Sequence, residues 1–286
     1  MSKSKAVVLT LFTTIALVFS SGGFAFSKQE MGTIINLAGK QRMLTQKMTK
    51  EILLIAKGID VDANRASLKN TAALFDKTLK GLVDGDVSLG LPKTSDAAIL
   101  AQLGKVSALW TAFKPNVDAA IAGTPSKSAL ENVAAQNLPL LKNMNKAVRM
   151  YARMSGSNLD PAMATTINLA GKQRMLTQKM TKELLLIANG IDIDATNKAN
   201  LHKTVSLFER TLKGLFDGDA GLGLPGTKDT AIRAQLEVVQ GLWNDYKPVL
   251  DKADTSTAGL AKAAKLNIPL LKEMNKAVKM YENAVK

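Results

Sequence analysis

The chain has 286 residues, no cysteine, one histidine and a formal net charge of +14. The lack of cysteine excludes disulfides, so the fold must be stabilised by buried apolar side chains, for which the chain is long enough. The basic balance favours anionic partners. Only 5% of the residues are aromatic, and this low content, with the export signal described next, argues against a nucleic-acid-binding protein.

Residues 1–25 are predicted to be a secretory signal peptide. Lys3 and Lys5 precede an apolar run at 6–20, which is too short for a membrane-spanning helix. Small residues just before and at Ala25 are typical of a cleavage site. We expect cleavage after Ala25 to release a soluble periplasmic or secreted protein, with a net charge lowered to +12 by the loss of the two lysines.

The remainder of the chain is an internal repeat. The stretch INLAGKQRMLTQKMTKE at Ile35–Glu51 returns without a change at Ile167–Glu183, although the flanking sequence differs. Matches such as Trp110 with Trp243 continue through the later part of each copy. Ser, Gly, Asn and Pro residues between the copies are typical of a linker. The predicted organisation is a first unit at 30–154, a linker at 155–161 and a second unit at 162–286.

Each unit is predicted to contain four helices and no strand. Apolar residues recur with a period near 3.6, and no segment alternates with a period of two. Gly58 and Gly85 lie where helices should end. Short connections favour antiparallel neighbours, so the expected fold is all-α, with two tandem antiparallel four-helix bundles. In the first unit the helices are expected at about 32–57, 63–84, 95–122 and 127–153.

Prolines interrupt two of these helical patterns in each unit. A proline inside a helix removes a backbone hydrogen bond and costs about 3 kcal/mol. We therefore expect kinks or breaks at Pro115 and Pro139, and the same bends at Pro248 and Pro269 of the second unit.

The repeated stretch has three faces when it is drawn as a helix. One face is apolar and predicts the core, with Leu37, Leu44, Met48, Ile52 and Ile55. A second face carries charges and is expected to be solvated, with Lys40, Lys47, Lys50 and Glu51. The third face surrounds Arg42 with small or neutral polar residues, namely Ala38, Gly39, Thr45, Gln46 and Thr49.

The third face is a candidate site for a small oxyanion. An amphipathic helix needs only two faces. Alanine and glycine allow another backbone to approach, and a guanidinium group matches a planar anion with paired donors. The alternative is a packing face whose arginine is solvated or paired with a glutamate elsewhere. The candidate ligand-binding residues are Ala38, Gly39, Arg42, Thr45 and Gln46, with Ala170, Gly171, Arg174, Thr177 and Gln178 in the second copy.

The segment 36–47, NLAGKQRMLTQK, resembles the signature of PilJ/NarX-type sensor domains. The resemblance covers nearly all of both units, although Lys40 and Lys47 stand where that signature often has arginine. It implies periplasmic four-helix bundles of nitrate-responsive kinases and chemoreceptors, in which the first helices of two subunits meet and one arginine from each holds the anion.

This resemblance implies that Arg42 and Arg174 could hold one nitrate or nitrite between two first helices of a single chain. In that internal pseudo-dimer Gly39 and Gly171 would permit close approach. The competing arrangement is an extended rod in which each arginine meets a second chain in a homodimer. Because the sequence shows no kinase or methyl-accepting region, we expect the signal to pass to a membrane receptor or kinase.

Other functions are less well supported by the sequence. The alternative is a non-catalytic adaptor bundle whose arginine-bearing faces contact receptors or pilus-associated machinery. We expect no enzyme, because no nucleophile–base–acid set is visible. We also expect no metal or other cofactor: the methionines have core spacing, His202 has no counterpart in the first unit, and the Asp84-Gly85-Asp86 turn lacks further calcium ligands.

Overall fold

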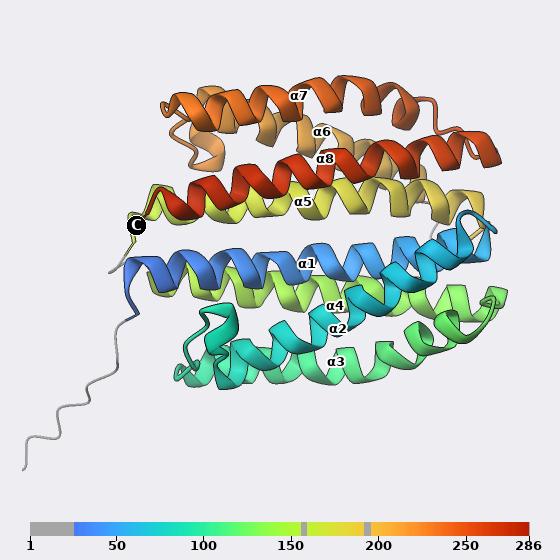
Figure 1. Cartoon of the computed structure of the whole chain (residues 1–286), viewed down its shortest axis with the longest axis horizontal. Coiled ribbons are helices and arrows are strands. Elements are labelled where there is room, and N and C mark those ends of the chain that lie inside the picture. Colours follow the sequence, from blue (N-terminus) through green and yellow to red (C-terminus); the bar gives the residue numbers. More distant parts are fainter. Residues whose placement is uncertain (1–25, 156–158, 192–195, 286) are drawn as a thin grey trace, which may run out of the picture.

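The computed structural model describes residues 26–155, 159–191 and 196–285, and in these residues the fold is all-α (Figure 1). The predicted signal peptide lies outside the described residues. The first unit contains α1 (Lys28–Ala56), α2 (Val61–Asp84), α3 (Ala97–Ala122) and α4 (Lys127–Met154). The second contains α5 (Pro161–Ala188), α6 (Asn197–Asp217), α7 (Thr230–Asp251) and α8 (Thr257–Asn283). Short 3₁₀ turns at Val87–Leu89 and Ala220–Leu222 follow α2 and α6.

Local sequence signals account for most helix ends. Ser27 and Glu30 form a capping box at the start of α1, with reciprocal hydrogen bonds of 3.1 and 2.7 Å. Asp96 caps α3 and Asp160 caps α5, just before Pro161. Gly85 ends α2 with a φ of 85°, a left-handed conformation that disfavours other residues. The Asp84-Gly85-Asp86 segment is thus a helix-ending turn.

The four prolines do not break their helices. Pro115 lies inside α3, Pro139 inside α4, Pro248 inside α7 and Pro269 inside α8, and each helix is continuous through its proline. Of the expected kinks or breaks, the breaks are wrong. The packing of these long amphipathic helices outweighs the one backbone hydrogen bond that each proline removes.

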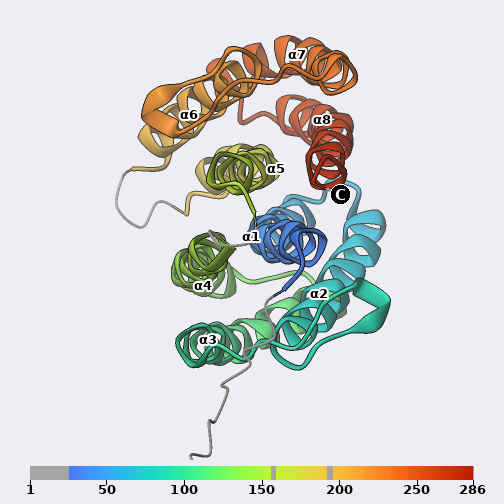
Figure 2. The ribbon, with the colours of Figure 1, turned by 90° about the vertical axis from the view of Figure 1, so that its left-hand side faces the viewer.

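The two units lie side by side, and α1 and α5 form the centre of the molecule (Figures 1 and 2). These two helices run parallel, and their interface is the most extensive between any two helices described. Helix α1 also packs against α2, α4 and α8, whereas α5 packs against α6, α8 and α4. The extended rod is therefore not the arrangement of this chain.

Aromatic side chains pack in the core of each unit. Trp110 packs against Phe75 with ring centroids 4.7 Å apart, and Trp243 packs against Phe208 at 4.4 Å. Both tryptophans are buried. His202 is exposed on α6. In the described part of the chain no group of three or more acidic or histidine side chains could hold a metal ion.

The prediction that the charged face of the repeated stretch is solvated is wrong at two positions in each copy. Lys50 and Glu51 are 5% and 1% exposed, and Lys182 and Glu183 are buried in the same way. The helical pattern predicts one buried side, but α1 and α5 are each surrounded by helices of both units. Of the predicted core residues, only Leu37 is partly exposed.

Candidate functional site

The two identical stretches meet along the middle of the molecule. Ala38 and Ala170 have no exposed surface, and Gly39 and Gly171 are buried in the same interface. Small residues on both helices allow the parallel backbones to approach. These small residues leave room for two large side chains, one from α1 and one from α5, on the faces where the two helices meet.

Arg42 and Arg174 lie between these helices, and each is 1% exposed. A Cβ atom placed on Gly39 would lie 3.2 Å from Nη2 of Arg42 and 3.8 Å from Nη2 of Arg174. At Gly171 the corresponding distances are 3.7 Å and 3.3 Å. The two guanidinium groups therefore lie close together beside the paired glycines, and we call them the arginine pair.

Each arginine reaches across to the other helix. Nη2 of Arg42 donates a hydrogen bond of 3.0 Å to the backbone oxygen of Asn168, and Nη2 of Arg174 donates one of 3.0 Å to the backbone oxygen of Asn36. These crossed bonds follow from the parallel pairing, because helical side chains lean toward the N-terminus of their own helix. Each unit thus completes the polar surroundings of the other unit's arginine.

A second asparagine contacts each guanidinium from the last helix of its own unit. Nη1 of Arg42 donates to Oδ1 of Asn145 at 2.8 Å, and Nη1 of Arg174 donates to Oδ1 of Asn275 at 2.8 Å. Nε of Arg174 is buried and has no hydrogen-bond partner. Because a guanidinium group carries five N–H donors, both arginines retain donors for a ligand.

No carboxylate neutralises the arginine pair: in the described residues, neither guanidinium group forms an ion pair. Glu282 favours the charged form of Arg174 from a distance, but its carboxylate accepts a hydrogen bond of 2.5 Å from Nδ2 of Asn36. In the described residues, the hydrogen-bond partners of the two guanidinium groups are neutral oxygens. In the part of the chain that the structure describes, two positive charges are therefore buried next to each other and neither is ion-paired.

Burial disfavours the charged form of both arginines, and the charge of Arg174 adds to this effect at Arg42. Burial, and then the charges of Arg174 and Arg149, lower the pKa of Arg42 to about 9. Burial lowers the pKa of Arg174 to about 10, against the opposing effect of Glu282. The pKa of Lys40 is also lowered, first by burial and then by the charge of Arg174. An anion placed here would reverse these effects.

The predicted threonine and glutamine ligands direct their polar groups elsewhere. The hydroxyl of Thr45 donates to the backbone oxygen of Arg42, and that of Thr177 to the backbone oxygen of Gln173. Nε2 of Gln46 donates to Asn137 at 3.0 Å, and Nε2 of Gln178 donates to Asn267 at 2.7 Å. The structure therefore brings together the arginines, glycines and alanines of the predicted set, and places these four side chains one turn further along the helices.

The asparagines were not predicted as site residues. Asn145 and Asn275 contact the arginine pair, while Asn137 and Asn267 contact the next polar layer. A signal was present, because these asparagines recur at equivalent places in the two copies, in Asn-Leu/Ile-Pro-Leu-Leu-Lys and Met-Asn-Lys-Ala-Val. Their partners are on distant helices, and that part of the arrangement is not visible in the sequence.

The sequence matches the family described as Type IV pili methyl-accepting chemotaxis transducer N-term, PilJ, over residues 25–136 and 161–267. The chain belongs to the PilJ family. The two matched segments correspond to the two units, so the PilJ unit occurs twice.

Curated relatives of this PilJ-family chain are chemotaxis proteins. Methyl-accepting chemotaxis protein McpN of Pseudomonas aeruginosa is 32% identical over 136 residues, which are 47% of this chain and 24% of that protein. Putative methyl-accepting chemotaxis AlkN of Alcanivorax borkumensis is 24% identical over 245 residues, which are 84% and 33% of the two chains. Protein PilJ of P. aeruginosa is 25% identical over 230 residues, which are 78% of this chain and 33% of that protein.

This chain spans about a quarter to a third of the length of these relatives. The family assignment supports a sensor-type domain of a signal-transduction system. None of the helices in the described residues is both long and apolar enough to cross a membrane.

Proposed function

We propose that this protein is a ligand-binding sensor whose arginine pair holds one small oxyanion, such as nitrate or nitrite, between α1 and α5. The observation that supports this is the burial of two guanidinium groups side by side, neither of which forms an ion pair within the described residues. Two buried like charges destabilise a fold, and a buried anion between them offsets that cost. A planar oxyanion matches the paired N–H donors of both groups.

Anion binding would be coupled to the packing of the two units. Arg42 and Arg174 each hydrogen-bond to the backbone of the opposite unit and to the last helix of their own unit. A ligand that draws the guanidinium groups together acts on α1, α5, α4 and α8 at once. We propose that this change is passed to a membrane receptor or kinase, with the protein located in the periplasm after cleavage of residues 1–25.

The adaptor alternative has less support. In that alternative the arginine-bearing faces bind another protein. Both arginines are 1% exposed, and α1 and α5 cover each other's faces. A partner protein could reach these faces only if the two units separated.

Thermal unfolding of the full chain with and without nitrate tests the proposal. We expect nitrate to raise Tm, since a ligand at about 100 times its Kd stabilises the native state by about 2.7 kcal/mol. Arg42→Gln and Arg174→Gln should each abolish this increase. Arg153→Gln, a change at an exposed arginine on α4, is the control and should retain it. An equal increase of Tm in all four proteins would show that the arginine pair does not hold the anion.

A further inference from the structure

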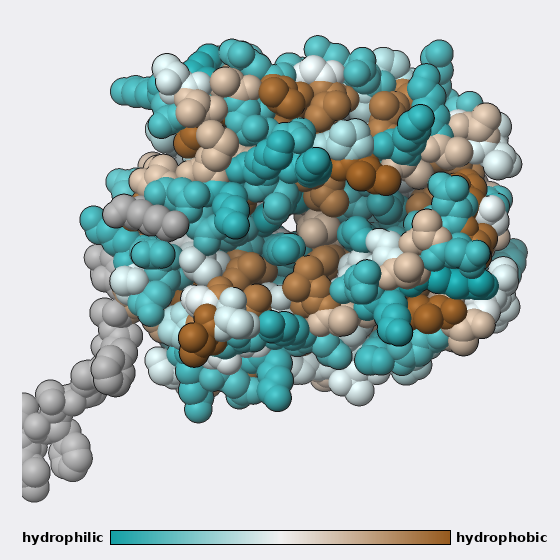
Figure 3. Space-filling view, viewed as in Figure 1, coloured by the Kyte–Doolittle hydropathy of each residue, from teal (hydrophilic) through white to brown (hydrophobic). Residues whose placement is uncertain are grey.

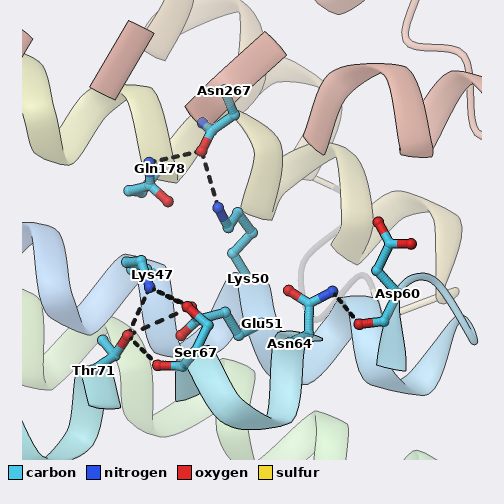
Figure 4. A network of polar contacts seen from close by, with 9 residues as sticks. All are labelled: Lys47, Lys50, Glu51, Asp60, Asn64, Ser67, Thr71, Gln178 and Asn267. Atoms are coloured by element: carbon cyan, nitrogen blue, oxygen red, sulfur yellow. Dashed lines mark hydrogen bonds and ion pairs between the residues drawn. The ribbon is translucent and has the colours of Figure 1, made fainter. Parts of the chain in front are cut away.

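A second polar layer lies on α1 and α5 beyond the arginine pair, centred on a buried lysine in each unit. Nζ of Lys50 crosses from α1 toward α8, where it donates a hydrogen bond of 2.9 Å to Oδ1 of Asn267 (Figure 4). Nζ of Lys182 likewise donates to Oδ1 of Asn137 on α4 at 3.3 Å. Each lysine on the central helix of one unit thus reaches an asparagine on the last helix of the other.

The hydrogen bonding of Lys50 is incomplete. An ammonium group has three donors, yet within the described residues Nζ of Lys50 has this one hydrogen bond and no ion pair. Its acceptor, Oδ1 of Asn267, is shared with Nε2 of Gln178 at 2.7 Å. The lysine is 5% exposed, so water covers little of it. Burial, and then the charge of Lys47, lower its pKa to about 8, against the opposing effect of Glu51.

The neighbouring carboxylate is already engaged with other groups. Lys47 forms an ion pair with Oε1 of Glu51, and the same oxygen accepts hydrogen bonds from Ser67 and Thr71 of α2 (Figure 4). Lys47 also donates to both hydroxyls at 2.7 Å. Oε1 of Glu51 is therefore engaged by its own cluster, whereas Oε2 is buried without a hydrogen-bond partner, and in the described residues Lys50 forms no ion pair of its own.

Lys50 and Asn267 line a cleft of about 580 Å³ between α1, α2 and α8. The space-filling view shows this side of the molecule hollowed between α8 and α2, with apolar residues in the hollow (Figure 3). Ile268, 64% exposed, stands at its edge. The apolar wall consists of Leu54, Ala63, Ala261, Ala264 and Leu271.

The other unit has a counterpart of about 460 Å³ between α4, α5 and α6, lined by Lys182 and Leu138. Leu138 is 45% exposed and is equivalent in the repeat to Ile268. In the described residues, these two are among only four large apolar side chains that are exposed. The same combination of a buried lysine, a partly apolar wall and an exposed aliphatic residue therefore occurs twice.

We propose that each cleft binds one small monocarboxylate with a short aliphatic tail, with the carboxylate on the buried lysine and the tail against the apolar wall. The volumes are in the range of small-ligand sites. A monoanion is favoured over a dianion because Glu51 and Glu183 lie next to the lysines. Lysines outnumber acidic side chains by two around each cleft, and this excess of positive charge attracts anions. The first cleft is lined by Lys47, Lys50, Lys262 and Lys265 and by the acidic Glu51 and Asp60. The second is lined by Lys142, Lys179 and Lys182 and by the acidic Glu183.

Calorimetric titration of the full chain with hexanoate tests this proposal. We expect two sites per chain in the wild type, one in Lys50→Met, one in Lys182→Met and none in the double variant. Hexanol, which has the tail without the charge, should not bind, and acetate should bind at least tenfold more weakly than hexanoate. A wild type that does not bind hexanoate, or binding unchanged by both lysine substitutions, overturns the proposal.

Surface variants keep the test valid if a lysine variant does not fold. Ile268→Glu places a negative charge at the edge of the first cleft and should weaken hexanoate binding there at least tenfold. Val238→Glu, on α7, is the matched control at a position that is 49% exposed and lines neither cleft, and it should bind as the wild type does. Equal binding by both variants contradicts the proposed position of the tail.

The site is independent of the arginine pair. Hexanoate should bind Arg42→Gln and Arg174→Gln with unchanged affinity, and saturating nitrate should not displace it. If either arginine substitution abolishes hexanoate binding while Lys50→Met retains both sites, the carboxylate binds at the arginine pair and the proposal is wrong. Failure of nitrate to bind leaves these hexanoate results unaffected, so the two proposals are tested separately.

Discussion

Two pairs of buried cations on the same two helices have different surroundings. Arg42 and Arg174 face each other between α1 and α5, whereas Lys50 and Lys182 point to opposite sides of the molecule, toward α8 and α4. On each helix the lysine lies eight positions after the arginine, which corresponds to about 12 Å of rise and about 80° of rotation around the helix axis. That rotation decides whether a residue meets its own copy or a helix of the other unit.

The difference shows what internal duplication does to a binding surface. Two parallel copies of one helix are related by an approximate two-fold axis, and a residue on that axis can contribute to only one shared site. A residue away from the axis produces two separate sites. The arginine pair therefore suits one anion per chain, and the lysine layer, which we define as Lys50, Asn267, Lys182 and Asn137, suits two ligands per chain.

The largest expected effect is on the lysine layer. Asn267 is fully buried, and its side chain accepts from Lys50 and Gln178 and donates to Thr177 at 2.7 Å. Asn267→Ala removes all three bonds and leaves a buried ammonium without an acceptor. We expect a loss of about 3 kcal/mol or more in the free energy of unfolding, measured by urea denaturation.

Asn275→Ala is the matched change at the arginine pair. Asn275 is exposed, so water can replace the acceptor that Arg174 loses, and we expect a cost of about 1 kcal/mol. Equal losses in Asn267→Ala and Asn275→Ala would contradict the difference in burial on which the comparison depends.

The second prediction concerns pH. The pKa of Lys50 and that of Lys182 are each lowered to about 8 by burial. Between that value and the ordinary lysine pKa near 10.4, the unfolded chain binds more protons, so stability should rise with pH. Each lysine contributes up to about 1.4 kcal/mol per pH unit. Urea denaturation from pH 8 to 10 should therefore give an upward slope that Lys50→Met and Lys182→Met each reduce.

The upper limit of this window is set by tyrosines. The pKa of Tyr151 and that of Tyr246 are raised to about 12 by burial, so their stabilising contribution declines as pH rises above the ordinary value near 10. Lys69→Met, at an exposed lysine of α2, is the control and should leave the slope below pH 10 unchanged. A wild-type slope that is flat or downward from pH 8 to 10 would contradict the charge penalty.

The third prediction separates the two members of the lysine layer. The Lys50–Asn267 hydrogen bond is 2.9 Å long and the Lys182–Asn137 bond is 3.3 Å. A double-mutant cycle with Lys→Met and Asn→Ala should give a coupling energy of about 1.5–2 kcal/mol for the first pair and less for the second. Coupling that is stronger in the second pair would show that the longer bond is not the weaker one.

Local sequence patterns predicted much of this molecule. The ends of the four helices of the first unit were predicted to within four residues, and the turns at Gly58 and Gly85 follow from glycine at left-handed positions. The third face of the repeated stretch was recognised because Arg42 is surrounded by small residues. These features depend on residues within a few turns of one another.

The burial of Lys50 and Glu51 depends on long-range packing and was missed for that reason. A helical pattern shows the angles between side chains but not how many helices surround them. Charged residues normally mark the solvated side, but here Lys50 reaches α8 of the other unit and Glu51 contacts α2 of its own unit. The hydrogen-bond partner of Lys50, Asn267, lies 217 positions away in the chain, and only the approach of the two units brings the two residues together.

The smallest expected effect on stability comes from Gly39→Ala, yet this change should alter anion binding. Alanine favours a helix by about 1 kcal/mol relative to glycine. A Cβ atom at 3.2 Å from Nη2 of Arg42 is closer than ordinary contact, so the guanidinium group must move. The two effects oppose each other, and we expect a change in unfolding free energy below about 1 kcal/mol, with a clear reduction of the nitrate-induced rise in Tm.

Gly104→Ala is the control for this change, because nothing lies within 4 Å of the added Cβ on the exposed side of α3. It should stabilise the fold by about 0.5–1 kcal/mol and leave the nitrate effect unchanged. Gly171→Ala should repeat the result of Gly39→Ala, since its Cβ would lie 3.3 Å from Nη2 of Arg174. If both Gly39→Ala and Gly171→Ala retain the full nitrate effect, the anion does not depend on the position of the guanidinium groups beside the glycines, and the shared site on the axis is wrong even if the protein binds nitrate elsewhere.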